Sequence, residues 1–389
     1  MRLPLFALLL GGAAYAAPTF TKDVAPILYR RCVECHRAGE AAPMALTTYK
    51  EVRPFAKAIR EAVLANRMPV WLADPEHGKF KNDRSLSALE KETIRQWVAA
   101  GAPEGMPQEL PPLPPMVTGW NIGKPDRVID IGREYAVPAS GTVPYQYFEV
   151  DPGFKEDAWV EAAEIRPDQR SVVHHVIVFM NDANGKPVDD AGGDLLVGWA
   201  PGDPPLRLPE GTAMRVKAGT RFRVQMHYTP NGKPVNDRTY FGLRYAKKPP
   251  TREAITGRAI NTRLAIPAMA ADHVEKADWK FRRPVEIISY MPHMHVRGKS
   301  FQYAMNYPDG RREVLLDVPK YDFGWQLSYE PVTPLQVPAG ARMECEAHYD
   351  NSPNNRNNPD PSKPVRWGDQ TWEEMMIGWF TYTVPVKGD

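Results

Sequence analysis

Three short histidine motifs are the part of this sequence best suited to bind metal ions. They contain five of the nine histidines, namely His174, His175, His227, His293 and His295. Residues at i and i+2 of a β-strand share a face, so His293 and His295 can direct their imidazoles at one ion. Two ligands make a weak site, and Met375 offers a thioether as the third. Two imidazoles and a thioether favour copper, especially Cu(I), over zinc or magnesium.

The adjacent pair His174 and His175 needs a different backbone. Neighbours in a regular strand point to opposite faces, so both rings can bind one ion only if the strand ends or bulges there, or if they use different ring nitrogens. In Arg221–Tyr228, hydrophobic residues alternate with polar ones, and His227 falls on the polar side. A metal or a cleft could reach His227 there.

A second cofactor motif lies near the start of the chain. Cys32, Cys35 and His36 form CxxCH, the attachment sequence of c-type haem, in which two thioethers and one axial imidazole meet the same porphyrin. A zinc or redox CxxC is the alternative, but a second cysteine pair and a thioredoxin-like context are both lacking. We predict Met68 as the sixth haem ligand, because a thioether suits an electron-transfer haem, with Met44 as the competitor.

The elements around this motif are predicted to be helical. We expect a helix capped by Asp23 before the motif and an amphipathic helix over 55–65. A third helix should begin with a capping box at Ser87 and Glu90 and end at Gly101, and its buried face is expected to hold Leu89, Ile94, Trp97 and Val98. This arrangement resembles a class I cytochrome c domain over about 85 residues. Residues 106–117 contain many prolines, which predicts a stiff linker.

Export is predicted from the first residues. MRLPLFALLLGGAAYAA has a basic start, an apolar run and small residues, as expected of a secretory signal cut near Ala16 or Ala17. We therefore expect a periplasmic or secreted protein with no integral membrane segment once the signal is removed. The formal net charge of +2 argues against nucleic acid as a partner.

The rest of the chain is predicted to be all-β. Its 389 residues are too many for one core, and period-two hydrophobic patterns and turn sequences run from about 118 to the end, with a break near 247–250. The fold class is a small all-α cytochrome c domain followed by two jelly-roll-like β-sandwiches. The expected boundaries are a signal peptide at 1–17, a cytochrome domain at 18–105, the linker at 106–117 and copper-binding domains at 118–248 and 249–389.

The histidine motifs together show a family resemblance. HHVIVF, QMHYT, HMH and EEMM, in this order, resemble the copper type II, ascorbate-dependent monooxygenases over roughly 118–386. The resemblance implies two β-sandwiches that face each other across a solvent cleft. Carried over by residue, it implies an electron-transfer copper at His174, His175 and His227, and an oxygen-binding copper at His293, His295 and Met375. Met376 is the neighbouring alternative to Met375, and the preceding Glu374 and the strand pattern that follows favour Met375.

Departures from that family narrow the substrate. The peptide-hydroxylating members use an Arg, an Asn and a Tyr around the substrate, whereas this sequence has Met291, Ile377 and Trp379 at those positions. We therefore expect a small organic substrate more apolar than a peptide carboxylate. The resemblance implies hydroxylation of an aliphatic C–H bond with O2. The fused cytochrome suggests that haem relays electrons from an external donor, either ascorbate or a redox protein.

Other interpretations remain to be weighed. One is a copper-binding electron carrier without catalysis, and another is a haem-fused copper nitrite reductase. The latter needs a cysteine-ligated copper, for which Cys345 with His348 is the only source. We expect instead that Cys345 is a buried strand residue and that His348 is hydrogen-bonded. His77 and His273 are expected on the surface.

Overall fold

The computed structural model describes residues 17–40, 42–117, 119–182, 184–186 and 195–386. The predicted secretory signal falls on residues 1–16, outside this range, and on Ala17. In the described part of the chain, no helix is long and apolar enough to span a membrane. The chain forms two compact units. The first comprises the described residues of Met1–Ala38, Pro43–Pro69 and Ser85–Pro114, and the second those of Gly39–Ala42, Val70–Arg84 and Pro115–Asp389.

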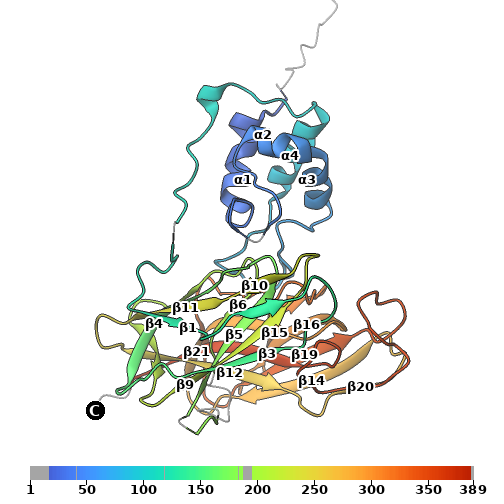
Figure 1. Ribbon diagram of the computed structural model, residues 1–389. Helices are drawn as coiled ribbons and strands as arrows, with labels where there is room; N and C mark the ends of the chain where they lie inside the picture. Colours follow the sequence, from blue (N-terminus) through green and yellow to red (C-terminus); the bar gives the residue numbers. More distant parts are fainter. Residues whose placement is uncertain (1–16, 41, 118, 183, 187–194, 387–389) are drawn as a thin grey trace, which may run out of the picture. The chain divides into compact units, whose positions relative to one another are not determined.

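The first unit is helical (Figure 1). Its elements are η1 (Phe20–Val24), α1 (Ala25–Arg31), α2 (Tyr49–Val52), η2 (Arg53–Phe55), α3 (Ala56–Leu64), α4 (Ala88–Ala99) and η3 (Pro107–Glu109). The predicted capping box of Ser87 and Glu90 is present at α4, and the fully buried Trp97 anchors this helix. The first cap differs from the prediction: Thr19 is the N-cap, and the Asp23 carboxylate instead accepts the Thr19 amide at 2.7 Å.

The segment Val70–Arg84 belongs to the second unit, although the sequence analysis assigns it to the cytochrome domain. The Asp74 amide donates to the carbonyl of Asp317 at 2.8 Å. The ring of Trp71 lies against that of Tyr329, with centroids 5.0 Å apart. These contacts attach the segment to the β-structure.

The first half of the β unit is a sandwich of two sheets. One sheet contains β1 (Arg127–Asp130), β11 (Thr239–Tyr245), β4 (Ala158–Pro167) and β8 (Thr212–Val216), with β7 (Leu206–Arg207) beside β4. The facing sheet contains β3 (Gln146–Val150), β9 (Arg221–Tyr228), β5 (Val173–Asn181) and β6 (Leu195–Trp199). As predicted, the apolar side of β9 fills the core between them, and each such side chain contributes about 1.5–3 kcal/mol on burial.

The second half is a sandwich of similar design. One sheet contains β12 (Arg252–Ile260), β21 (Ile377–Pro385), β15 (Val285–His293) and β18 (Leu335–Val337), and the other β14 (His273–Lys280), β19 (Arg342–Tyr349), β16 (Gly298–Asn306) and β17 (Arg312–Val318). Two short pairs complete the unit: β2 (Tyr135–Val137) with β10 (Val235–Asp237), and β13 (Ala265–Ile266) with β20 (Val365–Arg366). Tyr303 on β16 donates its hydroxyl to the Trp379 carbonyl on β21 at 3.0 Å, which joins the layers.

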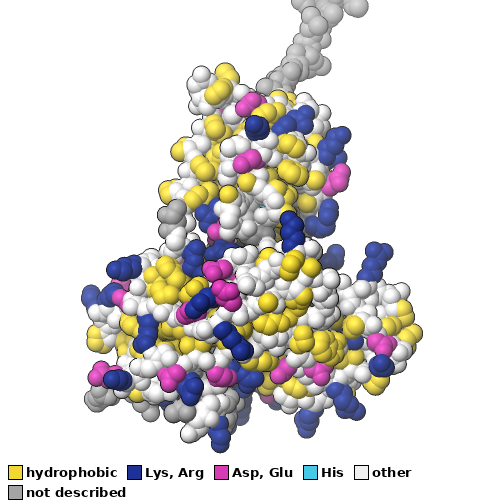
Figure 2. Space-filling model, viewed as in Figure 1, with side chains coloured by type: hydrophobic (Ala, Val, Ile, Leu, Met, Phe, Trp, Pro, Cys, Tyr) yellow, Lys and Arg dark blue, Asp and Glu magenta, His cyan; other side chains and the backbone are white. Residues whose placement is uncertain are grey.

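A single sheet runs through both halves. Strand β12 pairs in parallel with β8 through Arg252–Thr212 and Glu253–Ala213, so the sheet has nine strands. The chain is thus mostly a β-sandwich protein with a short helical N-terminal region. Basic and acidic side chains are interspersed on the face of the β unit seen in Figure 2, as a nearly balanced net charge suggests.

Candidate metal centre

A β-bulge brings the two adjacent histidines together. Along β5, Val173 pairs with Tyr228 on β9, but the next pair is His175 with His227, so the register shifts by one residue at His174. A bulge of this kind redirects a side chain that regular alternation would send to the other face. Of the alternatives that the sequence left open, a strand end, a bulge or the use of different ring nitrogens, the structure has the bulge.

The three histidines of the first half form one cluster. Their ring centroids are 5.4 Å apart for His174 and His175, 4.6 Å for His174 and His227, and 5.1 Å for His175 and His227. Each offers one ligand nitrogen, and these nitrogens all lie within 4.8 Å of one another. This cluster could hold a metal ion.

The nitrogen atoms of this cluster are spaced as the ligands of one metal ion would be. His174 Nδ1 and His175 Nδ1 are 3.2 Å apart. Two nitrogens bound tetrahedrally to one ion at about 2.0–2.1 Å would be separated by roughly 3.3 Å. Among the described residues, His175 Nε2 and His227 Nδ1 are buried and have no hydrogen-bond partner. Unpaired buried polar atoms are costly, so a ligand that uses such lone pairs would remove a penalty.

Burial also keeps these imidazoles neutral. Desolvation, reinforced by neighbouring histidines, lowers the pKa of His174 to about 4 and that of His227 to about 2. The pKa of His175 is lowered well below its ordinary value for the same reasons. Metal ions bind the neutral imidazole. The predicted polar side of β9 is therefore not a solvent face at His227, which is only 5% exposed and touches Thr371.

The second pair of histidines presents a different nitrogen. His293 Nδ1 lies 2.6 Å from Gln326 Oε1, and His295 Nδ1 lies 3.2 Å from the carbonyl oxygen of Glu373. Both acceptors require Nδ1–H, which leaves each Nε2 with a lone pair, as in many metal sites. His295 Nε2 is buried and has no partner among the described residues. Burial lowers the pKa of His293 to about 4 and that of His295 to about 3.

Met375 lies next to this pair in the fold. Ile377 on β21 pairs with His293 on β15, and Met375 precedes it by two residues, which is the same-face spacing of an extended chain. Its side chain is 9% exposed and packs in an apolar cluster with Ile377 and Trp379. Met376 is fully buried and lies outside that cluster. Met375 as the third ligand of His293 and His295 stays a prediction.

A buried carboxylate lies behind the second pair. Glu374 is fully buried and accepts the backbone amides of His295 at 2.8 Å and Arg297 at 2.7 Å. Burial raises the pKa of Glu374 to about 8, against the lowering effect of these amides and of the Arg297 charge. Glu374 therefore fixes the backbone at His295. The sequence reasoning used this glutamate only to choose Met375 over Met376.

The two groups of histidines are adjacent, in contrast to the solvent cleft that the resemblance implies. The rings of His175 and His293 are 6.4 Å apart at their centroids. Phe323 stacks on His174 at 4.8 Å and also contacts His295 at 5.8 Å. Tyr145 contacts rings of both groups: His175, His227 and His295. Sequence reasoning missed Tyr145, Phe323 and Gln326, which have no distinctive motif around them.

The remaining cysteine and histidines lie apart from this centre. Cys345 is fully buried in β19 and faces Gly378. His348 is three positions on, with its ring against Asp272 and Glu346. His273 is partly exposed and bonds Glu275. The interpretation of Cys345 as a buried strand residue is confirmed, and these contacts do not support a copper site at Cys345 and His348.

In the helical unit, the CxxCH motif forms a turn after α1 rather than part of the helix. The His36 amide donates to the Cys32 carbonyl at 2.9 Å, which brings one cysteine and the histidine to the same side of the turn. The His36 Nδ1 lies 3.2 Å from the Met44 carbonyl oxygen, which leaves Nε2 for an axial bond. Burial lowers the pKa of His36. These features fit a covalent haem, whose presence stays a prediction.

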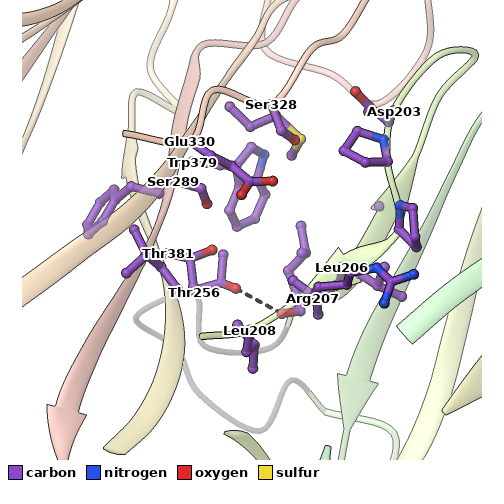
Figure 3. Close-up of a pocket in the computed structure, with 18 of the residues that line it drawn as sticks. Asp203, Leu206, Arg207, Leu208, Thr256, Ser289, Ser328, Glu330, Trp379 and Thr381 are labelled. Carbon is purple, nitrogen blue, oxygen red and sulfur yellow. Dashed lines mark hydrogen bonds between the residues drawn. The ribbon is translucent and has the colours of Figure 1, made fainter. Parts of the chain in front are cut away.

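A cavity of about 100 Å³ lies beside β15, the strand that ends at His293 (Figure 3). Its walls include Leu195, Met291 and Trp379, and the first and last of these belong to the apolar cluster that contains Met375. Met291 pairs with Trp379 two residues before His293 on β15. In Figure 3, Ser289, Thr256 and Thr381 lie on one side and Leu206, Arg207 and Leu208 on the other. The cavity is thus mainly apolar, with hydroxyl groups along one wall and charged side chains of both signs in its lining, namely Lys81, Asp203, Arg207 and Glu330.

Comparisons with known proteins leave the family open. No protein-family model matches the chain, and no curated protein matches it. Among solved structures, the STIV MCP is 8% identical, with 66% of this chain and 96% of that chain covered and a TM-score of 0.26. The structure of infectious bursal disease virus Gx strain is 10% identical, with coverages of 67% and 72% and a TM-score of 0.21. An allantoicase is 10% identical, with coverages of 56% and 81% and a TM-score of 0.17. Similarities of this size establish neither a shared fold nor a function.

Proposed function

We propose that this protein is an exported, copper-dependent monooxygenase that hydroxylates an aliphatic C–H bond with O2 and receives electrons through a covalent haem c. The observation that carries the proposal is the cluster of His174, His175 and His227, whose ligand nitrogens lie within 4.8 Å of one another. A second pair of histidines with oriented rings lies directly beside it. One metal-binding cluster would suit a carrier protein, whereas a second group beside it, with Met375 proposed as its third donor, suits redox catalysis.

The residues of the centre have distinct parts in this proposal. His174, His175 and His227 would hold one copper, and His293, His295 and Met375 the other. When bound, copper supplies the activation of O2 and the one-electron chemistry, as cofactors do in general. The protein keeps the imidazoles neutral by burial, orients two of them through Gln326 and the Glu373 carbonyl, and excludes water with Tyr145 and Phe323.

Electrons would enter through the helical unit. Cys32 and Cys35 would attach the haem, with His36 and Met68 as axial ligands. A haem with a thioether ligand has a raised potential and suits electron transfer. The ultimate donor would be ascorbate or a redox protein, and the expected location is the periplasm or the extracellular space. This part of the proposal rests on the order of the motifs in the chain.

The cavity beside β15 suggests the class of substrate. Its walls are mainly apolar and also carry hydroxyl groups and the charged side chains of Lys81, Asp203, Arg207 and Glu330, two of each sign. Met291 stands where a carboxylate-binding arginine would be expected from the resemblance. An uncharged, largely apolar organic molecule would bury its surface there at about 25 cal/mol per Å². We therefore propose such a molecule rather than a peptide carboxylate.

The test combines metal analysis with product formation. The purified exported protein is expected to contain one haem and two copper ions, with nitrogen hyperfine structure in the Cu(II) EPR spectrum. His175→Ala should lose the first copper, and His293→Ala should lose the second. Each variant should also lose turnover. The control His348→Ala removes a histidine that faces Asp272 and Glu346, so it should retain both metals.

Two results would contradict this function. Wild-type protein that binds no copper would remove its basis. Protein that binds both coppers and haem but never couples O2 consumption to a hydroxylated product, over a panel of apolar substrates, would be an electron carrier instead.

A further inference from the structure

Gln326 has a polar side-chain atom within 3.5 Å of a ring nitrogen in each of the two groups of histidines. Its Oε1 lies 2.6 Å from His293 Nδ1, and its Nε2 lies 3.5 Å from His175 Nδ1. The side chain is only 7% exposed. A buried carboxamide without partners is costly, so these two contacts determine where it lies.

The orientation of this amide decides which nitrogen of His293 can bind a metal. With Oε1 toward His293, Nδ1 must carry the proton and Nε2 has the lone pair. With the amide reversed, its NH2 group would donate to Nδ1, the proton would move to Nε2, and the metal-binding lone pair would be lost. The 2.6 Å contact of Oε1 with His293 Nδ1 is the first orientation. The NH2 group then lies 3.5 Å from His175 Nδ1, beside the first group.

The segment that carries Gln326 is fixed to both groups as well. The hydroxyl of Tyr321 donates to the Met294 carbonyl at 2.7 Å and lies 3.1 Å from the Met294 amide, between the two histidines of the second pair. Phe323 stacks on His174 with the ring planes 23° apart. Gln326 therefore lies on a short segment in which Tyr321 contacts the backbone of the second pair and Phe323 contacts His174 of the first group.

We propose that Gln326 is a positioning residue that fixes the Nδ1–H tautomer of His293, and thereby the second metal site. This inference rests on the proposed function. It adds a specific determinant: the affinity of the second site for copper depends on a side chain that supplies no ligand atom. Outer-sphere partners of metal-bound histidines typically change metal affinity by about 10–100-fold when removed.

Three variants test this role. Gln326→Leu keeps the size but removes the hydrogen bond to His293 Nδ1, whereas Gln326→Glu keeps an acceptor for it. Gln336→Leu, at an exposed position of β18, is the matched control. Copper affinity is measured by titrating the full-length protein with Cu(I) against a colorimetric chelator, and the sites are resolved by the EPR spectrum after oxidation.

The expected result is selective. Gln326→Leu should weaken the second site about tenfold or more and leave the first site and the haem unchanged. Gln326→Glu should restore most of that affinity, and Gln336→Leu should match the wild type. Two copper sites of parental affinity and spectrum in Gln326→Leu would overturn the inference while leaving the proposed function intact. Equal loss at both sites in Gln326→Leu and Gln326→Glu would also overturn it, because Gln326 would then only support the fold. Absence of copper from the wild type would be a failure of the proposed function itself.

Discussion

Met44 and Met68 are the two candidates for the sixth haem ligand, and their positions relative to His36 distinguish them. The carbonyl oxygen of Met44 accepts a hydrogen bond from His36 Nδ1. Met44 therefore lies on the side of the imidazole that points away from an iron bound at Nε2. Met68 follows α3 in the same unit and has no such constraint. We therefore retain Met68 as the residue that would ligate from the opposite haem face.

Replacing each methionine should separate the two assignments. Met68→Ala should lower the haem reduction potential strongly, since loss of a thioether ligand removes the effect that raises it. Met44→Leu should leave the potential close to that of the wild type, because the carbonyl that holds His36 is retained. Redox titration of the ferric–ferrous couple measures both. A large shift in Met44→Leu with none in Met68→Ala would reverse the assignment.

Among the elements, β21 begins two residues after Met375, and the register of this strand depends on a close approach at Gly378. A Cβ added at Gly378 would lie 2.5 Å from the Cys345 Sγ and 3.1 Å from Tyr303 Cε1. The two sheets of the second sandwich are thus in contact where glycine pairs with Pro292, next to the pair of His293 and Ile377. Side chains added to a packed core typically cost about 1–3 kcal/mol.

A double-mutant cycle checks this packing. Gly378→Ala should lower the free energy of unfolding by about 1–3 kcal/mol and weaken copper at the second site. Cys345→Ala removes the sulfur and should recover part of the loss when combined with Gly378→Ala, which gives a non-zero coupling energy. Urea unfolding of the four proteins provides the measurement. Strictly additive effects would show that these residues do not meet.

At this scale, the sequence predicts what is local. The alternation in β9, the capping box of α4 and the possibility of a bulge at His174 all follow from neighbouring residues, and the structure has all three. Leu89 was expected on the buried face of α4 but is 76% exposed, because the apolar stripe of that helix is narrower than its pattern suggested. Gln326 and Phe323 could not be predicted, since they reach the histidines only through contacts between residues far apart in the chain.

At the scale of the whole molecule, one chain contains a predicted haem and a predicted copper centre. The two have a shared function only if electrons pass from the haem to the copper. Hydroxylation with O2 consumes two electrons from outside the substrate, so a one-electron haem must deliver them in successive steps. A haem that served another purpose would not respond to the state of the copper centre. The decisive quantity is therefore the rate at which ferrous haem is reoxidised when Cu(II) is present and O2 is absent.

Rapid mixing can measure that rate. Anaerobic full-length protein loaded with Cu(II) is mixed with enough reductant to reduce only the haem, and the haem absorbance is followed. We expect reoxidation of the haem as Cu(II) becomes Cu(I), with loss of the Cu(II) EPR signal in equal amount. The variant His175→Ala should slow or abolish this phase, because His175 belongs to the cluster that would accept the electron. Ferrous haem that persists beside Cu(II) in the wild type would show that the two cofactors act separately, and the electron donor to copper would then have to be external.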